Sequence, residues 1–185
     1  MRLLFVFMLI SFFAVAQQGE QKLAYQYYVN GEYDKAISIY QELNKERFSV
    51  AYYIPYFGSL LKTEQYKQAE KLAKKVAKIY PNSLKYQLEV GIVQRKSGNA
   101  KKADRTFKKI FENLTGQKSQ AINLANTFIR YDMYSDALRV YMLSEKLNAK
   151  SNFGTQKAQL YAHLGKIDLM IVEYLNELER NPKQK

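Results

Sequence analysis

Hydrophobic residues recur at helical spacing along almost the whole chain. Between residues 66 and 80 the apolar positions share one face of a helix, and the lysines between them lie largely on the opposite face. No segment shows the alternation of a half-buried strand. Turn-forming residues interrupt the helical pattern at Asn30-Gly31, Pro81-Asn82, Ser97-Gly98-Asn99, Thr115-Gly116 and Leu164-Gly165. The pattern predicts about ten helices of roughly 12–15 residues each, joined by short turns.

A short phrase also returns at an almost fixed interval of 33 or 34 residues. Its five copies begin at Gly31, Glu64, Gly98, Asp132 and Gly165. Five residues further on, the first four copies carry alanine and the fifth carries methionine. A fixed period of this length predicts a stack of helical hairpins. Such a stack works mainly by presenting a surface to a partner, so the period argues against a compact enzyme core.

The repeated positions resemble the tetratricopeptide repeat family over residues 17–185. Each family repeat is two antiparallel helices, with small residues at the eighth and twentieth positions and an aromatic near the twenty-fourth. The eighth positions here are Ala24, Phe57, Gly91, Ala125 and Ala158. The twentieth are Ala36, Ala69, Ala103, Ala137 and Met170, and the twenty-fourth are Tyr40, Ala73, Phe107, Tyr141 and Tyr174. Small residues at both crossing points let two helices approach closely.

The resemblance implies an all-α solenoid, a right-handed superhelix of about five hairpins. The repeats are expected at residues 17–49, 50–83, 84–117, 118–150 and 151–184. Phe57 and Met170 depart from the small-residue pattern, and Gly58 could take the place of Phe57. Residues 167–178 carry apolar side chains on the last expected helix, so this hairpin is expected to pack on a following domain or a partner, because helical stacks normally cover their last apolar face.

Residues 1–16 have the features of a cleavable export signal. Arg2 precedes an apolar run from Leu3 to Phe13, and Ala14-Val15-Ala16 matches the A-x-A pattern of a cleavage site. The competing interpretation is a membrane anchor, but the run is too short for a spanning helix, which needs about 20 residues. The chain has no cysteine, which excludes disulfides, thiolate metal sites and lipid attachment to cysteine. We therefore expect a periplasmic protein.

The chain offers little for catalysis and no expected cofactor or metal. It has a single histidine, His163, and lacks a phosphate-binding loop, a dinucleotide-binding glycine motif and a nucleophile elbow. Its formal net charge is +12. A basic exported protein favours anionic partners such as lipid headgroups, acidic polysaccharide or an acidic protein, and the export signal argues against nucleic acid.

The resemblance also implies a concave groove lined by the first helix of each hairpin. The candidate partner-binding residues carried over from family positions are Tyr25, Tyr28, Lys62, Lys85, Arg95, Lys96, Asn126, Arg130 and His163. The thirteenth position of successive repeats is cationic or protonatable from the second repeat onward, which favours an extended acidic segment. The family's carboxylate clamp for chaperone tails is not expected, because Gln21, Tyr25 and Glu89 stand at its key positions.

A second set of basic residues lies on the expected second helices. It comprises Lys71, Lys74, Lys75, Lys78, Lys101, Lys102, Arg105, Lys108 and Lys109. A convex face rich in charge is usually only solvated, and the sharper hypothesis is attachment to an anionic envelope surface.

Three functions stay open at this point. The leading one is a non-enzymatic scaffold of the bacterial envelope that serves assembly, secretion or motility. The alternatives are a basic adaptor for anionic polymer or lipid, and the N-terminal module of a longer enzyme or sensor.

Overall fold

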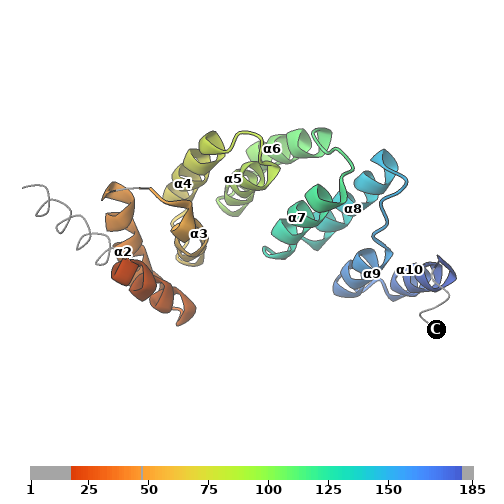
Figure 1. The fold of residues 1–185 in the computed structure, drawn as a ribbon, viewed down its shortest axis with the longest axis horizontal. Helices are drawn as coiled ribbons and strands as arrows, with labels where there is room; N and C mark the ends of the chain where they lie inside the picture. The colour runs from red at the N-terminus through yellow and green to blue at the C-terminus, as the bar shows by residue number, and fades with distance from the viewer. Residues whose placement is uncertain (1–17, 47, 181–185) are drawn as a thin grey trace, which may run out of the picture. The chain divides into compact units, whose positions relative to one another are not determined.

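The computed structural model describes residues 18–46 and 48–180, and within these ranges all regular structure is helical. The predicted all-α fold of helical hairpins is thereby confirmed. The chain divides into two compact units after Val76. Figure 1 labels the helices of both units. The expected export signal, residues 1–16, lies outside the described residues. No helix in the described ranges is long and apolar enough to cross a membrane.

The first unit contains helical residues 18–29, α2 (Tyr33–Glu46), the short 3-10 helix η1 (Val50–Tyr52), α3 (Tyr53–Lys62) and most of α4 (Tyr66–Ile79). Its core is aromatic: the ring of Tyr40 lies 5.6 Å from that of Tyr52 and 5.7 Å from that of Tyr56. A Cβ atom on Gly58 would lie 3.1 Å from the Tyr28 ring. Gly58, next to the bulky Phe57, is therefore the point of close approach that the sequence suggested.

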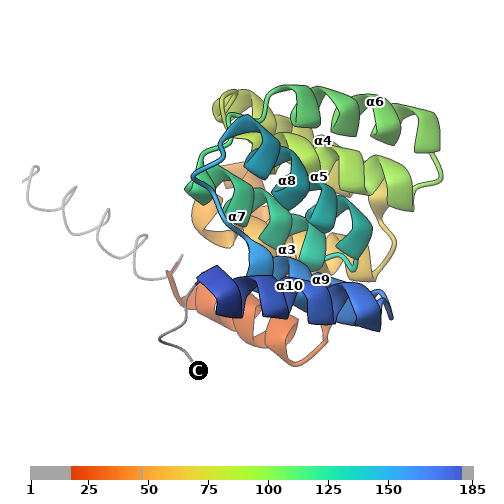
Figure 2. The ribbon, with the colours of Figure 1, turned by 90° about the vertical axis from the view of Figure 1, so that its right-hand side faces the viewer.

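The second unit consists of three further hairpins. Its helices are α5 (Leu84–Lys96), α6 (Ala100–Glu112), α7 (Lys118–Ile129), α8 (Tyr134–Leu147), α9 (Gly154–His163) and α10 (Ile167–Arg180). The helices pack in the pairs α5–α6, α7–α8 and α9–α10, and Figure 2 shows α9 and α10 side by side. Neighbouring hairpins meet through α5 with α7 and through α8 with α9.

Close packing in the second unit follows the repeat pattern. Gly91 has no room for a side chain, because a Cβ atom there would lie 2.4 Å from the Phe107 ring. Phe107 in turn packs edge-on against Phe128 of the next hairpin, at 5.6 Å between ring centres. Helices α3 and α9 have 10 residues each, fewer than the 12–15 expected. In α3 the reason is local, because the segment starts as the 3-10 turn η1.

The hairpin turns explain the repeated phrase. The first residue of every copy, Gly31, Glu64, Gly98, Asp132 or Gly165, has a positive φ between 58° and 83°. The residue after it donates its backbone N–H to the carbonyl five residues back, as in Glu32 to Tyr27 and Asn99 to Gln94, both at 2.8 Å. This is the Schellman arrangement that ends a helix on a left-handed residue. Three copies use glycine there, and two hold ordinary L-residues in the same conformation.

Candidate partner-binding surfaces

A pocket of about 390 Å³ opens in the first unit. Its lining residues come from residues 18–26, α2 and the start of the second hairpin, and they are Gln18, Gln21, Lys22, Tyr25, Gln26, Tyr40, Ala51, Tyr52 and Pro55. Residues 18, 21, 22 and 25 fall on one side of a helix because they are spaced by three and four. Four lining residues, Gln18, Gln21, Tyr25 and Ala51, stand at positions that line the groove in the resembled family. The structure thus brings part of the expected groove together as one hollow.

Tyr40 lines this pocket and carries a buried polar group. Its side chain is fully buried, yet its hydroxyl has no hydrogen-bond partner among the described residues. Burial raises the pKa of Tyr40, and the neighbouring Tyr25 and Tyr28 add to the increase. A buried polar group without a partner destabilises a fold, because it loses the hydrogen bond that it makes with water when exposed. Sequence reasoning treated Tyr40 only as a packing residue.

The other candidates of the first unit differ in their surroundings. Tyr25 is 54% exposed, while Tyr28 is half-buried beside Gly58 and Tyr33. Lys62 ends α3 and is exposed, and no ion pair within the described ranges includes it. Lys62 can therefore reach a partner without breaking a described ion pair, whereas Tyr25 also contacts the Tyr28 ring, at 6.2 Å between ring centres.

In the second unit the groove positions fall into two groups. Lys96 and Asn126 are exposed, and no hydrogen bond of their side chains is found among the described residues. Arg130 is partly neutralised, because its guanidinium lies 3.8 Å from the buried carboxylate of Glu89. His163 is exposed and stacks flat on Tyr134, with ring centres 4.5 Å apart. A partner could therefore bind Lys96 and Asn126 without displacing a described hydrogen bond, whereas it would compete with Glu89 for Arg130.

Arg95 is held within the fold. Its guanidinium donates to Asp104 of α6 and to Asp136 of α8, both at 3.0 Å. It also lies over the Phe107 ring, at 4.5 Å from the ring centre. Arg95 thus ties three helices of two hairpins together, which sequence spacing did not indicate. A partner that binds Arg95 would have to compete with two carboxylates.

Lys85 lies at a second, more polar pocket of about 380 Å³. The pocket is formed by the start of α5 and by α7, and its lining residues are Asn82, Ser83, Leu84, Lys85, Gln120, Asn123 and Leu124. Gln120 already accepts hydrogen bonds from the backbone and hydroxyl of Thr115, which fixes its amide. Lys85 is the only cation of this lining, so an anionic group is the ligand that would suit it.

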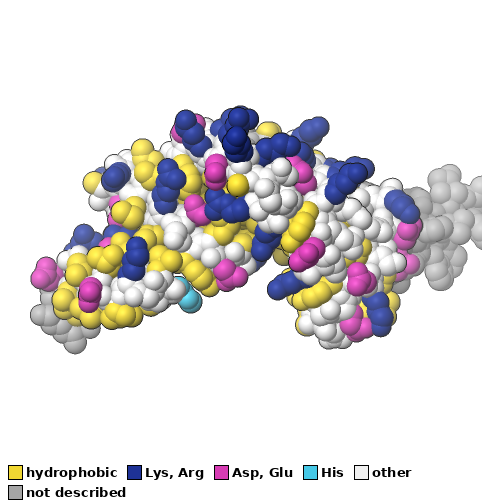
Figure 3. All heavy atoms as spheres, turned by 180° about the vertical axis from the view of Figure 1, so that it is seen from behind, with side chains coloured by type: hydrophobic (Ala, Val, Ile, Leu, Met, Phe, Trp, Pro, Cys, Tyr) yellow, Lys and Arg dark blue, Asp and Glu magenta, His cyan; other side chains and the backbone are white. Residues whose placement is uncertain are grey.

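The basic residues of the expected convex set are all exposed: Lys71, Lys74, Lys75 and Lys78 on α4, and Lys101, Lys102, Arg105, Lys108 and Lys109 on α6. Figure 3 shows lysine and arginine side chains, in dark blue, standing out at the surface. Some have local partners: Lys74 pairs with Glu70 at 2.7 Å, and Lys75 lies over the Phe48 ring. Surface pairs of this kind contribute little stability.

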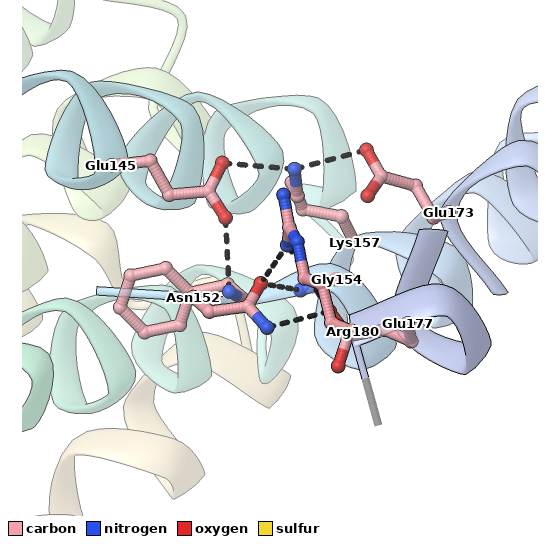
Figure 4. A network of polar contacts seen from close by, with 8 residues as sticks. Glu145, Asn152, Gly154, Lys157, Glu173, Glu177 and Arg180 are labelled. Atoms are coloured by element: carbon pink, nitrogen blue, oxygen red, sulfur yellow. Dashed lines mark hydrogen bonds and ion pairs between the residues drawn. The ribbon is translucent and has the colours of Figure 1, made fainter. Parts of the chain in front are cut away.

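An ion-pair network joins the last three helices (Figure 4). The ammonium of Lys157 on α9 lies 2.8 Å from Glu145 of α8 and 2.9 Å from Glu173 of α10. Burial is the largest influence on the pKa of Lys157 and lowers it, but hydrogen bonds to the two glutamates outweigh burial, and the pKa is raised. Sequence spacing did not indicate this network, because its members lie on three different helices.

No cluster of three or more metal-binding side chains occurs within the described ranges. His163, the only histidine, contacts an aromatic ring rather than a serine or a carboxylate. The surfaces assembled here are pockets and exposed side chains suited to binding.

Comparisons with known proteins agree with this architecture. Residues 21–47 match the family model for the tetratricopeptide repeat. No curated protein sequence matches the chain. Among solved structures, TTC0263, a thermophilic TPR protein in Thermus thermophilus, aligns with 90% of this chain and 92% of its own, at 18% identity and a TM-score of 0.50. MamA from Desulfovibrio magneticus RS-1 aligns with 89% of this chain and 95% of its own, at 14% identity and a TM-score of 0.48.

Proposed function

We propose that the chain is a tetratricopeptide repeat protein and a non-enzymatic scaffold that anchors a protein partner in the pocket of its first hairpin. The observation that carries the proposal is that Tyr40, a residue of the pocket lining, has a buried hydroxyl without a partner among the described residues. A buried polar group without a hydrogen bond lowers the stability of the fold. A hydrogen bond to a bound partner would remove that penalty.

The chemistry of the pocket defines the anchor. Tyr25, Tyr40, Tyr52 and Pro55 provide apolar walls, which suit an apolar or aromatic side chain. The Tyr40 hydroxyl can donate to a carbonyl or carboxylate oxygen of the partner. Lys22 at the pocket, together with the exposed Lys62 of the same unit, favours acidic residues beside the anchor. The partner is therefore an extended segment with one apolar residue and acidic neighbours.

The cellular setting is part of the same proposal. The apolar run of residues 3–13 and the A-x-A pattern at residues 14–16 support export to the periplasm. There the scaffold would organise envelope proteins for assembly, secretion or motility. The nine exposed basic residues of α4 and α6 support a weaker alternative, an adaptor for anionic polymer or lipid, whose binding would fall steeply with salt.

A peptide array tests the proposal by comparing the wild-type chain with a variant that lacks the Tyr40 hydroxyl. Acidic peptides with and without a central aromatic or aliphatic residue are screened against the wild-type chain and against Tyr40→Phe. Tyr141→Phe is the matched control, since Tyr141 stands at the same repeat position in the fourth hairpin. Loss of one hydrogen bond should weaken binding by Tyr40→Phe about 3- to 10-fold and leave Tyr141→Phe unchanged.

Stability measurements separate binding from folding. Tyr40→Phe removes an unpartnered buried group and should keep or raise the melting temperature at neutral pH. The pKa of Tyr40 is raised in the fold above its ordinary value of 10.0. Above pH 10.0 the tyrosine ionises more readily in the unfolded chain than in the folded one, so the wild type loses free energy of unfolding as pH rises. Tyr40→Phe should therefore lose less stability than wild type above pH 10.0. Equal peptide binding by wild type and Tyr40→Phe would remove the pocket from the proposal, and a folded wild type that binds no peptide would refute it.

A further inference from the structure

The last helix, α10, exposes most of its apolar residues. None of its residues is buried, although seven of its fourteen residues are large hydrophobics with more than a third of their surface exposed. These residues are Ile167, Leu169, Ile171, Val172, Tyr174, Leu175 and Leu178. Figure 3 shows hydrophobic side chains, in yellow, gathered over this last hairpin beside the single histidine. A contiguous apolar surface of this kind marks an interaction site in a folded protein.

The inner side of α10 is fixed by polar contacts (Figure 4). Glu173 pairs with Lys157 of α9, and Glu177 accepts from Asn152. Arg180 also donates to Asn152, at 2.8 Å. Glu177 covers Gly154, where a Cβ atom would lie 2.5 Å from its carboxylate. These contacts hold the acidic inner edge against α9 and leave the apolar side chains of α10 exposed.

The outer stripe has the spacing of a helix-pairing seam. Ile167, Ile171, Tyr174 and Leu178 follow one another at intervals of four, three and four residues, and Leu175 flanks them. This is the a/d spacing with which one helix receives another in knobs-into-holes packing. We infer that the outer face of α10, the α10 seam, binds an amphipathic helix of a partner protein.

The charges beside the seam indicate which kind of partner helix would bind there. Helix α10 contains four acidic residues and one arginine in a chain whose net charge is +12. Glu173 and Glu177 are neutralised by Lys157 and Arg180. Asp168 and Glu179, on the rim of the seam, enter no ion pair within the described ranges. The complementary partner is a helix with an apolar stripe and lysine or arginine beside it.

The same rim disfavours the other occupants of an apolar helix face. A second copy of α10 would bring a second acidic rim to the seam, and like charges on paired helices repel each other. An anionic lipid surface would be repelled by Asp168 and Glu179 for the same reason. The α10 seam thus differs in chemistry from the pocket of the first hairpin, where the exposed groups include lysine.

Two designed peptides test the inference. Both are about three heptads long and carry isoleucine and leucine at the core positions, but one has lysine flanks and the other glutamate flanks. Binding to the purified full chain is followed by fluorescence anisotropy at low salt. The lysine peptide should bind about three- to tenfold more tightly than the glutamate peptide. The double variant Asp168→Lys, Glu179→Lys should reverse this preference.

Substitutions within the seam provide a second test of the inference. Ile171→Gln with Leu175→Gln removes one core position of the seam and the leucine that flanks it, and should weaken binding of the lysine peptide at least tenfold. Leu169→Gln is the matched control, because Leu169 is similarly exposed on the same helix but lies outside the seam. Circular dichroism checks that each variant keeps its helices.

Three results would overturn the inference. These are equal binding of both peptides, a concentration-dependent dimer of the chain alone that disappears in the double glutamine variant, and co-sedimentation with vesicles containing phosphatidylglycerol that depends on the seam. None of them bears on the pocket of the first hairpin.

Discussion

Replacing Glu64 with glycine should stabilise the chain, because Glu64 holds a backbone conformation that suits glycine. Its φ is 58°, in the left-handed region, as are those of Gly31, Gly98 and Gly165 at the same position of other repeats. No side-chain hydrogen bond or ion pair of Glu64 occurs among the described residues, so its side chain offers nothing that offsets the strain.

The magnitude follows from two opposing effects. A left-handed conformation costs an ordinary L-residue about 1–2 kcal/mol. Replacement by glycine removes this strain, but it also costs about 0.5–1 kcal/mol, because glycine has more conformational freedom in the unfolded chain. Glu64→Gly should therefore raise the free energy of unfolding by about 0.5–1 kcal/mol. Asp132→Gly should gain less, since Asp132 accepts a 2.9 Å hydrogen bond from the Tyr134 hydroxyl that glycine would lose.

The assay is a urea titration followed by circular dichroism at about 222 nm, where helices absorb. With a slope of about 2 kcal/mol per molar, the midpoint should rise by about 0.3–0.5 M for Glu64→Gly. Gly98→Ala is the reverse test: no atom lies within 4 Å of the added Cβ, so any loss reports backbone strain alone. Glu64→Ala deletes the side chain but keeps the strain. The reasoning is refuted if Glu64→Ala stabilises as much as Glu64→Gly.

Substitutions at two further positions test the packing and the ion pairs of the second unit. Gly91→Ala should destabilise by about 1–3 kcal/mol in a thermal melt, because the new methyl group collides with Phe107, and Gly91→Ser should be worse. Lys157→Met should cost about 2–3 kcal/mol at neutral pH, because it leaves Glu145 and Glu173 without their shared cation. The raised pKa of Lys157 means that its contribution is complete below 10.5 and is lost above it, so the difference from wild type should shrink in urea titrations at higher pH.

The repeat phrase predicted the fold well, because its physical cause is local. Each copy begins at a residue with positive φ, and each small residue at a crossing point is demanded by contact with a neighbouring helix, as Gly91 is by Phe107. Backbone turns and close approaches repeat with the period of the hairpin, so they leave a periodic trace in the sequence. Even the departure at Phe57 was resolved by the adjacent Gly58.

The candidate site was less predictable, because it depends on contacts between residues far apart in the chain. Family positions placed Tyr25 and Gln21 at the groove, and the structure joins them in one pocket. Spacing gave no sign that Arg95 would be held by Asp104 and Asp136, which lie on two other helices. It also could not reveal that the Tyr40 hydroxyl lacks a partner, since a missing contact has no sequence pattern.

Two features of the chain stand out against the repeat pattern. Tyr40 buries a hydroxyl without a partner among the described residues, as Ser144 also does, and α10 leaves apolar residues in solvent while Glu173 and Glu177 contact the α9 side. Both features lower the stability of the isolated chain. Natural sequences tolerate such conflicts where function needs them. The two features call for opposite chemistry, an acidic anchored segment at the pocket and a basic amphipathic helix at α10. A scaffold that holds two different partners would use two sites of different chemistry, and the two proposed sites have that property.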